Sequence, residues 1–344
     1  MMENKNEKHL CSVSIVIPAH NSLTSIDKVI SSSLTQNYPK GKLEVIIVDD
    51  GSTDNTAEVI KKHSQVKYIY QQNAGAAKAR NTGWMNAGGD IICFTDSDCI
   101  PEKDWVNKLI TRYTSENIAG VGGSYDIADD KSWLARCIHE EIIQRHLKMP
   151  EISSHLASCN FSCRKNVLSQ IQGFDESFKA ASAEDNELSY RIRKKGYVLV
   201  FDKDIKVAHY HRTNLFSYLK QQFRHGYWCM KLYKLHPDMM TGDGYAGLID
   251  HIQPPLFLLC IASLGLLPFI PGVFYFFSLL LLITLLVLNL PMVIAIVQRK
   301  REKVYLLFIF LVFLRGIARS IGMSSGIFRF FILGPFLKKE NRVS

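Results

Sequence analysis

A long run without charged residues limits what this chain can fold into more than any other feature. Residues 254–297 contain no Asp, Glu, Lys or Arg. One helix needs about 20 apolar residues to cross a hydrocarbon core of roughly 30 Å, and this run is about twice that long. Pro268, Pro271 and Gly272 interrupt it near its middle. The sequence therefore predicts two transmembrane helices joined by a tight turn, at residues 256–270 and 273–297.

Basic residues follow the apolar run. Residues 298–303 include two Arg and two Lys, and such clusters mark the cytoplasmic side of a membrane. The next apolar segment, 304–322, carries Arg315 and Arg319 one helical turn apart. It is either a third membrane helix buried in a bundle or an interfacial helix with snorkelling arginines. We expect a multi-pass membrane protein whose N-terminal domain is cytoplasmic, and residues 1–10 lack the apolar core of a signal peptide.

Composition narrows the partners and the compartment. The chain has 41 Lys and Arg against 32 Asp and Glu, a formal charge of +9, which suits nucleic acid, a membrane surface or anionic substrates. Much of the excess lies close to the apolar region, and there is no RNA-binding signature or zinc-finger spacing. Anionic lipid is therefore favoured and nucleic acid is not expected. The 8 cysteines form no CxxC pair, as in reduced proteins.

Residues 11–235 alternate between strand-like and helix-like patterns. Apolar runs at 11–18, 43–48, 66–70 and 91–95 are separated by single helical segments, which predicts a mainly parallel, doubly wound α/β sheet flanked by helices. Later elements are expected at 103–113, 118–122, 132–147, 155–161, 182–195, 198–201, 205–208 and 215–235. We expect an N-terminal tail at 1–10, an α/β domain at 11–235, a linker at 236–253, a membrane region at 254–337 and a polar tail at 338–344.

The strand at 91–95 ends in Asp96, Ser97 and Asp98. Ligands of α/β sheets bind beyond the carboxyl ends of the strands. Two carboxylates this close repel each other unless a positive charge lies between them, and a divalent cation that also holds a diphosphate supplies that charge. A solvated turn is the alternative interpretation of the same three residues.

Four further polar clusters are expected near the same edge, and the first comprises residues 18–21 after the first strand. Asp49 and Asp50 follow the second strand, Asn73 and Gly75 open a helix that carries Arg80, and the acids 184–185 begin another helix. A helix start with a cation favours a diphosphate, and an acid on a rigid helix start can act as a general base. Turn residues, a solvated helix and acids that complement a helix dipole are the structural alternatives.

Taken together and in this order, the motifs resemble the family 2 inverting glycosyltransferases of GT-A fold over about residues 11–225. They are VIPAHN at 16–21, VDDGSTD at 48–54, NAG at 73–75, ARNTG at 79–83, DSD at 96–98 and ED at 184–185. The resemblance implies a GT-A fold and a nucleotide-diphosphate-sugar donor, with uridine favoured as the base. It also implies Mg²⁺ or Mn²⁺ as cofactor.

The resemblance also implies roles for individual residues. Asp185 matches the catalytic base, with Glu184 beside it. Asp98 would ligate the metal, Asp96 would lie against ribose and metal, and His209 could complete the metal shell, although a structural histidine is the alternative. The nucleotide-sugar site would comprise Pro18, Ala19, Asn21, Asp49, Asp50, Asn73, Arg80, Asp96 and Ser97.

The acceptor side is implied by fewer residues. Asn160 could shape an acceptor pocket, with an ordinary buried strand as the alternative, and Glu184 could contribute to acceptor or diphosphate binding. Arg224 lies in QQFRH, where His225 replaces the tryptophan of the QxxRW motif of processive synthases, which argues for one sugar per encounter. We expect a membrane-anchored hexosyltransferase-like enzyme acting on a lipid-linked or cell-envelope glycan acceptor. A nucleotide-sugar-binding scaffold without catalysis and a Mg²⁺-dependent nucleotidyltransferase are the alternatives.

Overall fold

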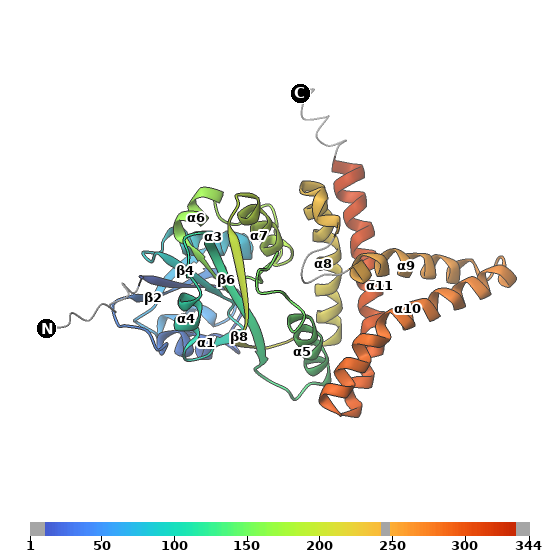
Figure 1. Ribbon diagram of the computed structural model, residues 1–344, viewed down its shortest axis with the longest axis horizontal. Helices are drawn as coiled ribbons and strands as arrows, with labels where there is room; N and C mark the ends of the chain where they lie inside the picture. The colour runs from blue at the N-terminus through green and yellow to red at the C-terminus, as the bar shows by residue number, and fades with distance from the viewer. Residues whose placement is uncertain (1–10, 242–247, 335–344) are drawn as a thin grey trace, which may run out of the picture. The chain divides into compact units, whose positions relative to one another are not determined.

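The computed structural model describes residues 11–241 and 248–334 (Figure 1). The expected tails at 1–10 and 338–344 lie outside the described residues, as do 242–247 of the expected linker and 335–337 of the membrane region. The chain divides into two compact units, residues 1–128 with 150–210 and residues 129–149 with 211–344. Residues 129–149 and 211–235 thus group with the C-terminal helices, whereas the sequence placed them in the α/β domain.

The first unit is built on a sheet in the order β3-β2-β1-β4-β7-β6-β8-β5. Its first four strands run parallel, as predicted, and the rest of the sheet is mixed because β7 runs antiparallel to both β4 and β6. The strands are β1 Val13–Ala19, β2 Leu43–Asp50, β3 Lys67–Gln71, β4 Ile91–Thr95, β5 Cys99–Pro101, β6 Ile118–Ile127, β7 Asn160–Arg164 and β8 Val198–His209.

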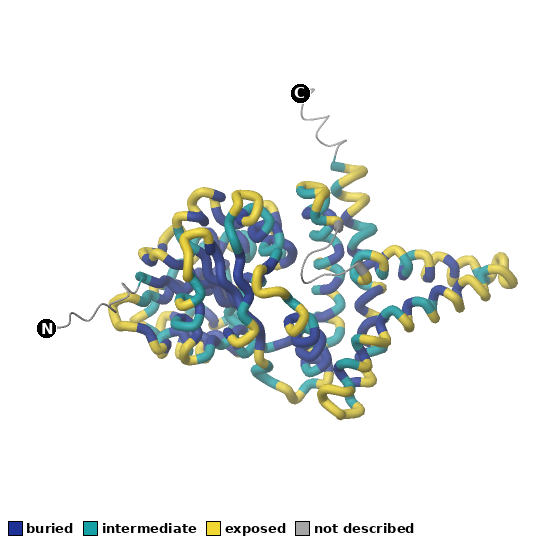
Figure 2. Tube along the Cα trace, in the orientation of Figure 1, coloured by how far each residue is buried: buried dark blue, intermediate teal, exposed yellow. Residues whose placement is uncertain are grey.

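Helices flank this sheet, and β1 and β4 are buried along their whole lengths (Figure 2). Strands covered on both sides read as continuous apolar runs, which is why the sequence located them. The helices are α1 Ile26–Leu34, α2 Thr56–Lys61, α3 Ala76–Met85, α4 Trp105–Thr111, α6 Lys165–Ile171 and α7 Glu184–Lys194.

Several predicted elements in this unit were wrong. The strand expected at 155–161 begins only at Asn160, and the strands expected at 198–201 and 205–208 are one strand, β8. The pairing of β8 with β6 shifts register between Gly123 and Ser124, and this irregularity carries the strand through polar residues that looked like a loop. The short elements β5 and α6 were not predicted.

The second unit is helical. It contains α5 Trp133–His146, α8 Leu215–Leu235, a 3-10 helix at Pro237–Thr241, α9 Leu248–Leu266, α10 Pro271–Lys300, a 3-10 turn at Lys303–Leu307, α11 Phe308–Ile327 and a π-helical end at Phe328–Leu333. Within the described residues, three helices are long and apolar enough to cross a membrane: Ile249–Leu266, Pro271–Lys300 and Lys303–Leu333. The first ends at Leu266 rather than 270, since Pro268 and Pro271 stop it.

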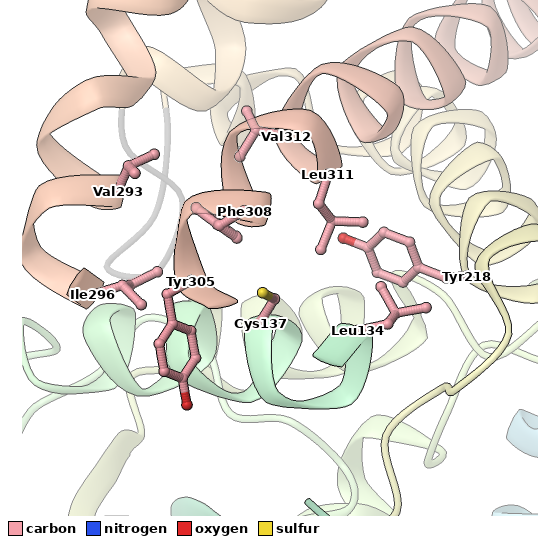
Figure 3. Packing of buried hydrophobic residues seen from close by; sticks show 9 residues of the cluster. All are labelled: Leu134, Cys137, Tyr218, Val293, Ile296, Tyr305, Phe308, Leu311 and Val312. Carbon is pink, nitrogen blue, oxygen red and sulfur yellow. The ribbon is translucent and has the colours of Figure 1, made fainter. Parts of the chain in front are cut away.

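Helix α5 belongs to this unit because both its apolar and its charged side chains contact the C-terminal helices. Its Leu134 and Cys137 lie in a core shared with α8, α10 and α11 (Figure 3). Glu140 contacts Arg299 at 2.6 Å and Lys300 at 3.0 Å, and Glu141 pairs with Arg315. These contacts fix a segment that is inserted into the sequence of the α/β unit.

Candidate active site

Asp49 and Asp50, the first two predicted site acids, accept hydrogen bonds that fix the loops at the sheet edge. Asp49 is fully buried, and it accepts hydrogen bonds from the backbone N–H of Ser52 and the hydroxyl of Tyr68, both at 2.9 Å. Burial, together with the Asp49 carboxylate, raises the pKa of Tyr68 to about 12. Asp49 therefore fixes the turn after β2.

Asp50 organises the loop that opens α3. Its Oδ1 accepts from Gln71 Nε2 at 2.7 Å and from the N–H of Ala74 at 2.8 Å, and its Oδ2 accepts from the N–H of Gly75 at 2.9 Å. Gly75 has φ 98°, and a Cβ there would lie 2.9 Å from the carbonyl oxygen of Lys179, so only glycine fits. The acid predicted to contact the base thus shapes the loop beside the nucleotide positions.

The residues after β1 line the same edge. Ala19 pairs with Asp49 and Asp50 with Gln71, which confirms that these strand ends meet. Pro18 and Ala19 are buried, while His20, Asn21 and Asn73 are exposed. Asn21 has φ 50° and its Oδ1 accepts from the N–H of Thr53 at 2.8 Å.

Arg80 joins two motifs that are far apart in the sequence. It is 1% exposed; its Nη1 donates to Glu184 Oε1 and its Nη2 to Asp96 Oδ1, both at 2.8 Å. The carboxylates of Asp96 and Glu184 outweigh burial and raise the pKa of Arg80. The guanidinium is thus a buried bridge between the DSD and ED motifs, a role that the sequence analysis missed.

Glu184 is an unusual partner for that bridge. It is buried, and burial with the neighbouring charge of Asp185 raises its pKa, while Arg80 opposes the rise. Its Oε2 has no hydrogen-bond partner among the described residues. A carboxyl group in this setting takes up a proton more readily than an ordinary glutamate.

Asp98, Cys99 and His209 bring their possible ligand atoms within 4.8 Å of one another. The antiparallel pairing of β5 with β8 places Cys99 opposite His209, and Asp98 Oδ2 lies 3.6 Å from His209 Nε2. Two ligands 2.0–2.1 Å from one Mg²⁺ lie about 3 to 4 Å apart, so this pair fits a hard divalent cation. Burial raises the pKa of the Cys99 thiol, and a thiol is a soft ligand that Mg²⁺ and Mn²⁺ do not favour.

The pKa of His209 reflects the carboxylates around it. Burial alone would lower its pKa, but the carboxylates of Asp98 and Asp96 outweigh it and raise the pKa to about 9. A cation bound here would replace the ring proton that the raised pKa retains, because only the neutral ring has a lone pair free to act as a ligand. Asp98 and His209 remain the predicted metal ligands.

Asp185 lies in the first turn of α7, after Ala183 in the left-handed conformation with φ 70°. Its Oδ1 accepts from the N–H of Asn186 at 2.9 Å, and the N–H of Ser158 lies 3.5 Å from Oδ2. Its charge also acts on Arg80. Because Arg80 holds the preceding Glu184 together with Asp96, Asp185 and the DSD motif belong to one electrostatic cluster.

Ser97 and Asn160 have internal partners. Ser97 Oγ lies 2.6 Å from Ser22 Oγ. Asn160 is buried; its Nδ2 donates to the carbonyls of Ser124 at 2.7 Å and Ile205 at 3.1 Å, and its Oδ1 accepts from Trp105 Nε1 at 2.8 Å. Asn160 therefore ties four segments together. The sequence analysis did not identify these partners.

Replacing Asn160 with Leu should destabilise the protein strongly. Loss of the amide leaves the Trp105 N–H and two carbonyls without their partner, and each buried unsatisfied group costs about 1–3 kcal/mol. We expect the free energy of unfolding to fall by about 3 kcal/mol or more, measured by urea denaturation. Asn73→Leu at the exposed position is the matched control and should change it by less than about 0.5 kcal/mol; equal effects would contradict the structural role.

Arg224 lies on α8 in the second unit, where it is exposed. The other predicted site residues all lie in the first unit.

Comparison with known proteins identifies a glycosyltransferase family. Residues 14–171 match the family model for Glycosyl transferase family 2. These residues form a family 2 glycosyltransferase domain. The match covers four parallel strands, α3 with Arg80 and the DSD motif, and it ends before the ED motif at the start of α7.

Similar glycosyltransferases occur in bacteria and archaea. The chain is 33% identical over 214 residues to a probable glycosyltransferase YdaM of Bacillus subtilis, covering 57% of this chain and 50% of that protein. It is 29% identical over 220 residues to glycosyltransferase AglE of Haloferax volcanii, covering 62% and 71%. It is 27% identical to a pre-mycofactocin glycosyltransferase of Mycobacterium tuberculosis, covering 66% and 48%. Two of these alignments thus span only about half of the relative.

Two solved structures share the fold. A mannosyltransferase from Pyrobaculum calidifontis, in complex with GDP-Man and Mn²⁺, aligns with TM-score 0.58 and 17% identity over 91% of this chain and 87% of that one. Residues 1–349 of TarS from S. aureus align with TM-score 0.50 and 19% identity over 92% and 91%. The mixed sheet with flanking helices is that of GT-A glycosyltransferases, as predicted.

Proposed function

We propose that this chain is a membrane-attached, inverting glycosyltransferase that transfers a sugar from a nucleotide-diphosphate-sugar to a lipid-linked or envelope glycan acceptor. The observation that carries the proposal is the Arg80 bridge. It holds Asp96 of the DSD motif and Glu184 of the ED motif on one guanidinium, 2.8 Å from each. The acid proposed to bind the donor and the residue preceding the proposed base are thereby held by one side chain.

Asp185 is the proposed general base. The N–H of Ser158 lies 3.5 Å from its Oδ2, a long contact that leaves this oxygen able to accept a proton. The acceptor hydroxyl would lose its proton to Asp185 as its oxygen attacks the anomeric carbon and the bond to the diphosphate breaks. Direct displacement requires attack from the side opposite the leaving group, so the configuration inverts.

Asp98 and His209 would hold a Mg²⁺ or Mn²⁺, with Asp96 nearby. Such a cation supplies positive charge against the departing nucleoside diphosphate. Both groups are held by the pairing of β5 with β8, through the hydrogen bond from the N–H of Tyr210 to the carbonyl of Asp98 at 2.9 Å. The Mn²⁺ in the complex of the Pyrobaculum mannosyltransferase supports metal use.

The donor and the cellular location are proposed on other grounds. Asp50, Asn73 and the loop before α3 would border the nucleotide, and a uridine diphosphate sugar follows from the family resemblance. The basic residues 298–303 at the end of the apolar run support a catalytic unit at the cytoplasmic face. Nucleotide sugars would reach the site there.

Slow hydrolysis of the donor tests this function without knowledge of the acceptor. The purified chain is incubated with UDP-, GDP- and dTDP-sugars in the presence of Mn²⁺, and the released nucleoside diphosphate is measured. We expect release from one donor class, fastest with a UDP-sugar. Release of inorganic pyrophosphate from nucleoside triphosphate and sugar phosphate would instead indicate nucleotidyl transfer.

Replacing His209 with Ala should weaken metal binding. Loss of one ligand is expected to raise the dissociation constant for Mn²⁺ by at least about tenfold, the lower range for changes around metal sites. Free Mn²⁺ is measured by its electron paramagnetic resonance signal. Tyr210→Phe, one residue further along, removes only a hydroxyl that contacts Lys28 and serves as the control; identical affinities in both variants would exclude His209 as a ligand.

A further inference from the structure

The turn between α9 and α10 is apolar throughout. Residues 264–277 contain no polar side chain other than Tyr275, and Phe269, Val273 and Phe276 are 78%, 71% and 70% exposed. A hairpin that crosses a bilayer completely places its turn in water or among headgroups on the far side, where polar residues are expected. The composition of this turn suits hydrocarbon.

The backbone of the turn also suits an apolar surrounding. The N–H of Leu267 donates to the carbonyl of Leu264 at 3.3 Å, and the N–H groups of Phe269 and Ile270 donate to Leu266 at 3.0 and 3.1 Å. Pro268 and Pro271 have no N–H. Residues 267–271 therefore leave none of their own backbone donors open, and few open donors is what non-helical backbone within a membrane requires. Gly272 and Val273 lie in the first turn of α10, which has no side-chain cap, and their N–H groups have no acceptor within the helix.

Helix α11 lies alongside α8 over most of its length. Arg319 Nε donates to Gln222 Oε1 at 2.8 Å, and Lys234 near the end of α8 donates to the carbonyl of Phe330. A Cβ at Gly322 would lie 2.1 Å from the carbonyl oxygen of Phe223, and one at Gly326 would lie 2.6 Å from that of Tyr227. The two backbones are thus in direct contact and run in the same direction.

This contact decides how α11 can meet a bilayer. Helix α8 carries Lys220, Arg224, Lys231 and Lys234. If α11 crossed the membrane, α8 would be drawn into the hydrocarbon with it. Each cation near the bilayer centre costs about 2.5–3.5 kcal/mol even by insertion measurements. The pair is therefore better placed along the membrane surface.

One face of α11 fits that surface. Five exposed large apolar residues of α11 and its π-helical end recur at spacings of three, four and seven and so share a single face: Phe310, Leu314, Ile317, Ile321 and Phe328. Exposed Ile327 lies off this face. Arg315 and Arg319 point to other partners, Glu141 and Gln222. An apolar stripe opposite charged residues is the pattern of a helix that lies in the plane of the interface.

The hairpin of α9 and α10 projects away from α11 (Figure 1). Phe257 of α9 lies on α11, with its ring centroid 5.7 Å from that of Phe313. From Phe257 to the end of α9 at Leu266, the helix rises by about 14 Å, roughly half of a 30 Å hydrocarbon core. With α11 at the interface, the turn ends inside the bilayer.

We propose that α9 and α10 form a re-entrant hairpin in the hydrocarbon of the lipid bilayer and that α11 lies in the plane of the same membrane face. The chain is then attached to one side of the membrane and does not cross it. This arrangement replaces the two crossings expected at 256–270 and 273–297, and it selects the interfacial alternative for 304–322. Both ends of the hairpin stay on the face where the basic residues 298–303 lie.

Thiol labelling in sealed membranes tests this topology. Gly272→Cys places a thiol in the turn, where an added Cβ meets nothing within 4 Å. Gln298→Cys and Arg329→Cys replace exposed residues near the end of α10 and beyond the end of α11. Intact cells and inside-out vesicles are treated with a membrane-impermeant maleimide, and each site is read by peptide mass mapping, which separates it from the native cysteines.

We expect the Gly272→Cys thiol to stay unlabelled from both sides and to react after detergent solubilisation and denaturation. The thiols at 298 and 329 should react only in inside-out vesicles. Labelling at 272 in intact cells would show a complete crossing, and labelling there in inside-out vesicles would show that the hairpin is not inserted. Labelling at 329 in intact cells would show that α11 crosses. Any of these three results overturns the proposal, and none depends on enzymatic activity.

Discussion

Replacing Asp185 with Asn should lower the rate of sugar transfer by about 10²–10⁴-fold, the usual contribution of a positioned general base. The amide keeps the size and the hydrogen bond from the N–H of Asn186, but it cannot take the acceptor proton. Donor binding should remain within about twofold, because the base acts in the reaction rather than in the ground state. Transfer is measured with a radiolabelled donor, and binding by calorimetry.

The matched control is Asp204→Asn, an exposed acid on β8, which should leave both quantities unchanged. A protein that only binds nucleotide sugars would be indifferent to both substitutions. Equal turnover by Asp185→Asn and the unmodified chain would therefore remove the assigned base and, with it, the proposed mechanism. Equal release of nucleoside diphosphate from the donor with and without the unmodified chain would instead exclude the enzymatic function.

Replacing Arg80 with Met should lower the free energy of unfolding by about 3–5 kcal/mol, the cost of removing one partner from a buried ion pair. The change leaves Glu184 buried without its cation, and it frees Asp96 from the site. Chemical denaturation measures the loss. Lys78→Met is the control on the same helix, because Lys78 makes a half-exposed pair with Glu176 at 3.1 Å, which is worth about 0–1 kcal/mol.

The loss in Arg80→Met should depend on pH. Burial and Asp185 already raise the pKa of Glu184, and removing Arg80 raises it further. Between the unfolded and folded pKa values the folded state then binds more protons than the unfolded state, so stability rises as the pH falls from neutral towards the ordinary carboxyl range. A destabilisation of Arg80→Met no larger than that of Lys78→Met at neutral pH would show that the bridge is unimportant.

Much of the catalytic unit could be predicted from local patterns. The strands β1, β2 and β4 are buried on both faces, so their apolar runs are continuous, and the acids that follow them fall at one sheet edge. The order of the motifs was sufficient to indicate the glycosyltransferase family, which the match over residues 14–171 confirms. These features depend only on neighbouring residues in the chain.

Contacts between distant segments could not be predicted in the same way. Arg80 was predicted to bind the nucleotide sugar, with a solvated helix as the alternative, and it is the buried link between Asp96 and Glu184. Asn160 was interpreted either as an acceptor contact or as part of a buried strand, and its amide is bonded to Trp105, Ser124 and Ile205. A hydrogen bond is set by the approach of two segments in space, and residue identity alone does not reveal it.

The sequence by itself determined that an α/β unit that starts with four parallel strands is followed by an apolar run long enough to enter a membrane, because both follow from the spacing of apolar and charged residues. Only the tertiary structure decided which side chains and helices from distant parts of the sequence lie next to each other. Strand register puts His209 next to Asp98, and glycine contacts bind α11 to the cationic helix α8. Hydropathy measures each helix alone, whereas the cost of burying a charge depends on the neighbour that moves with it.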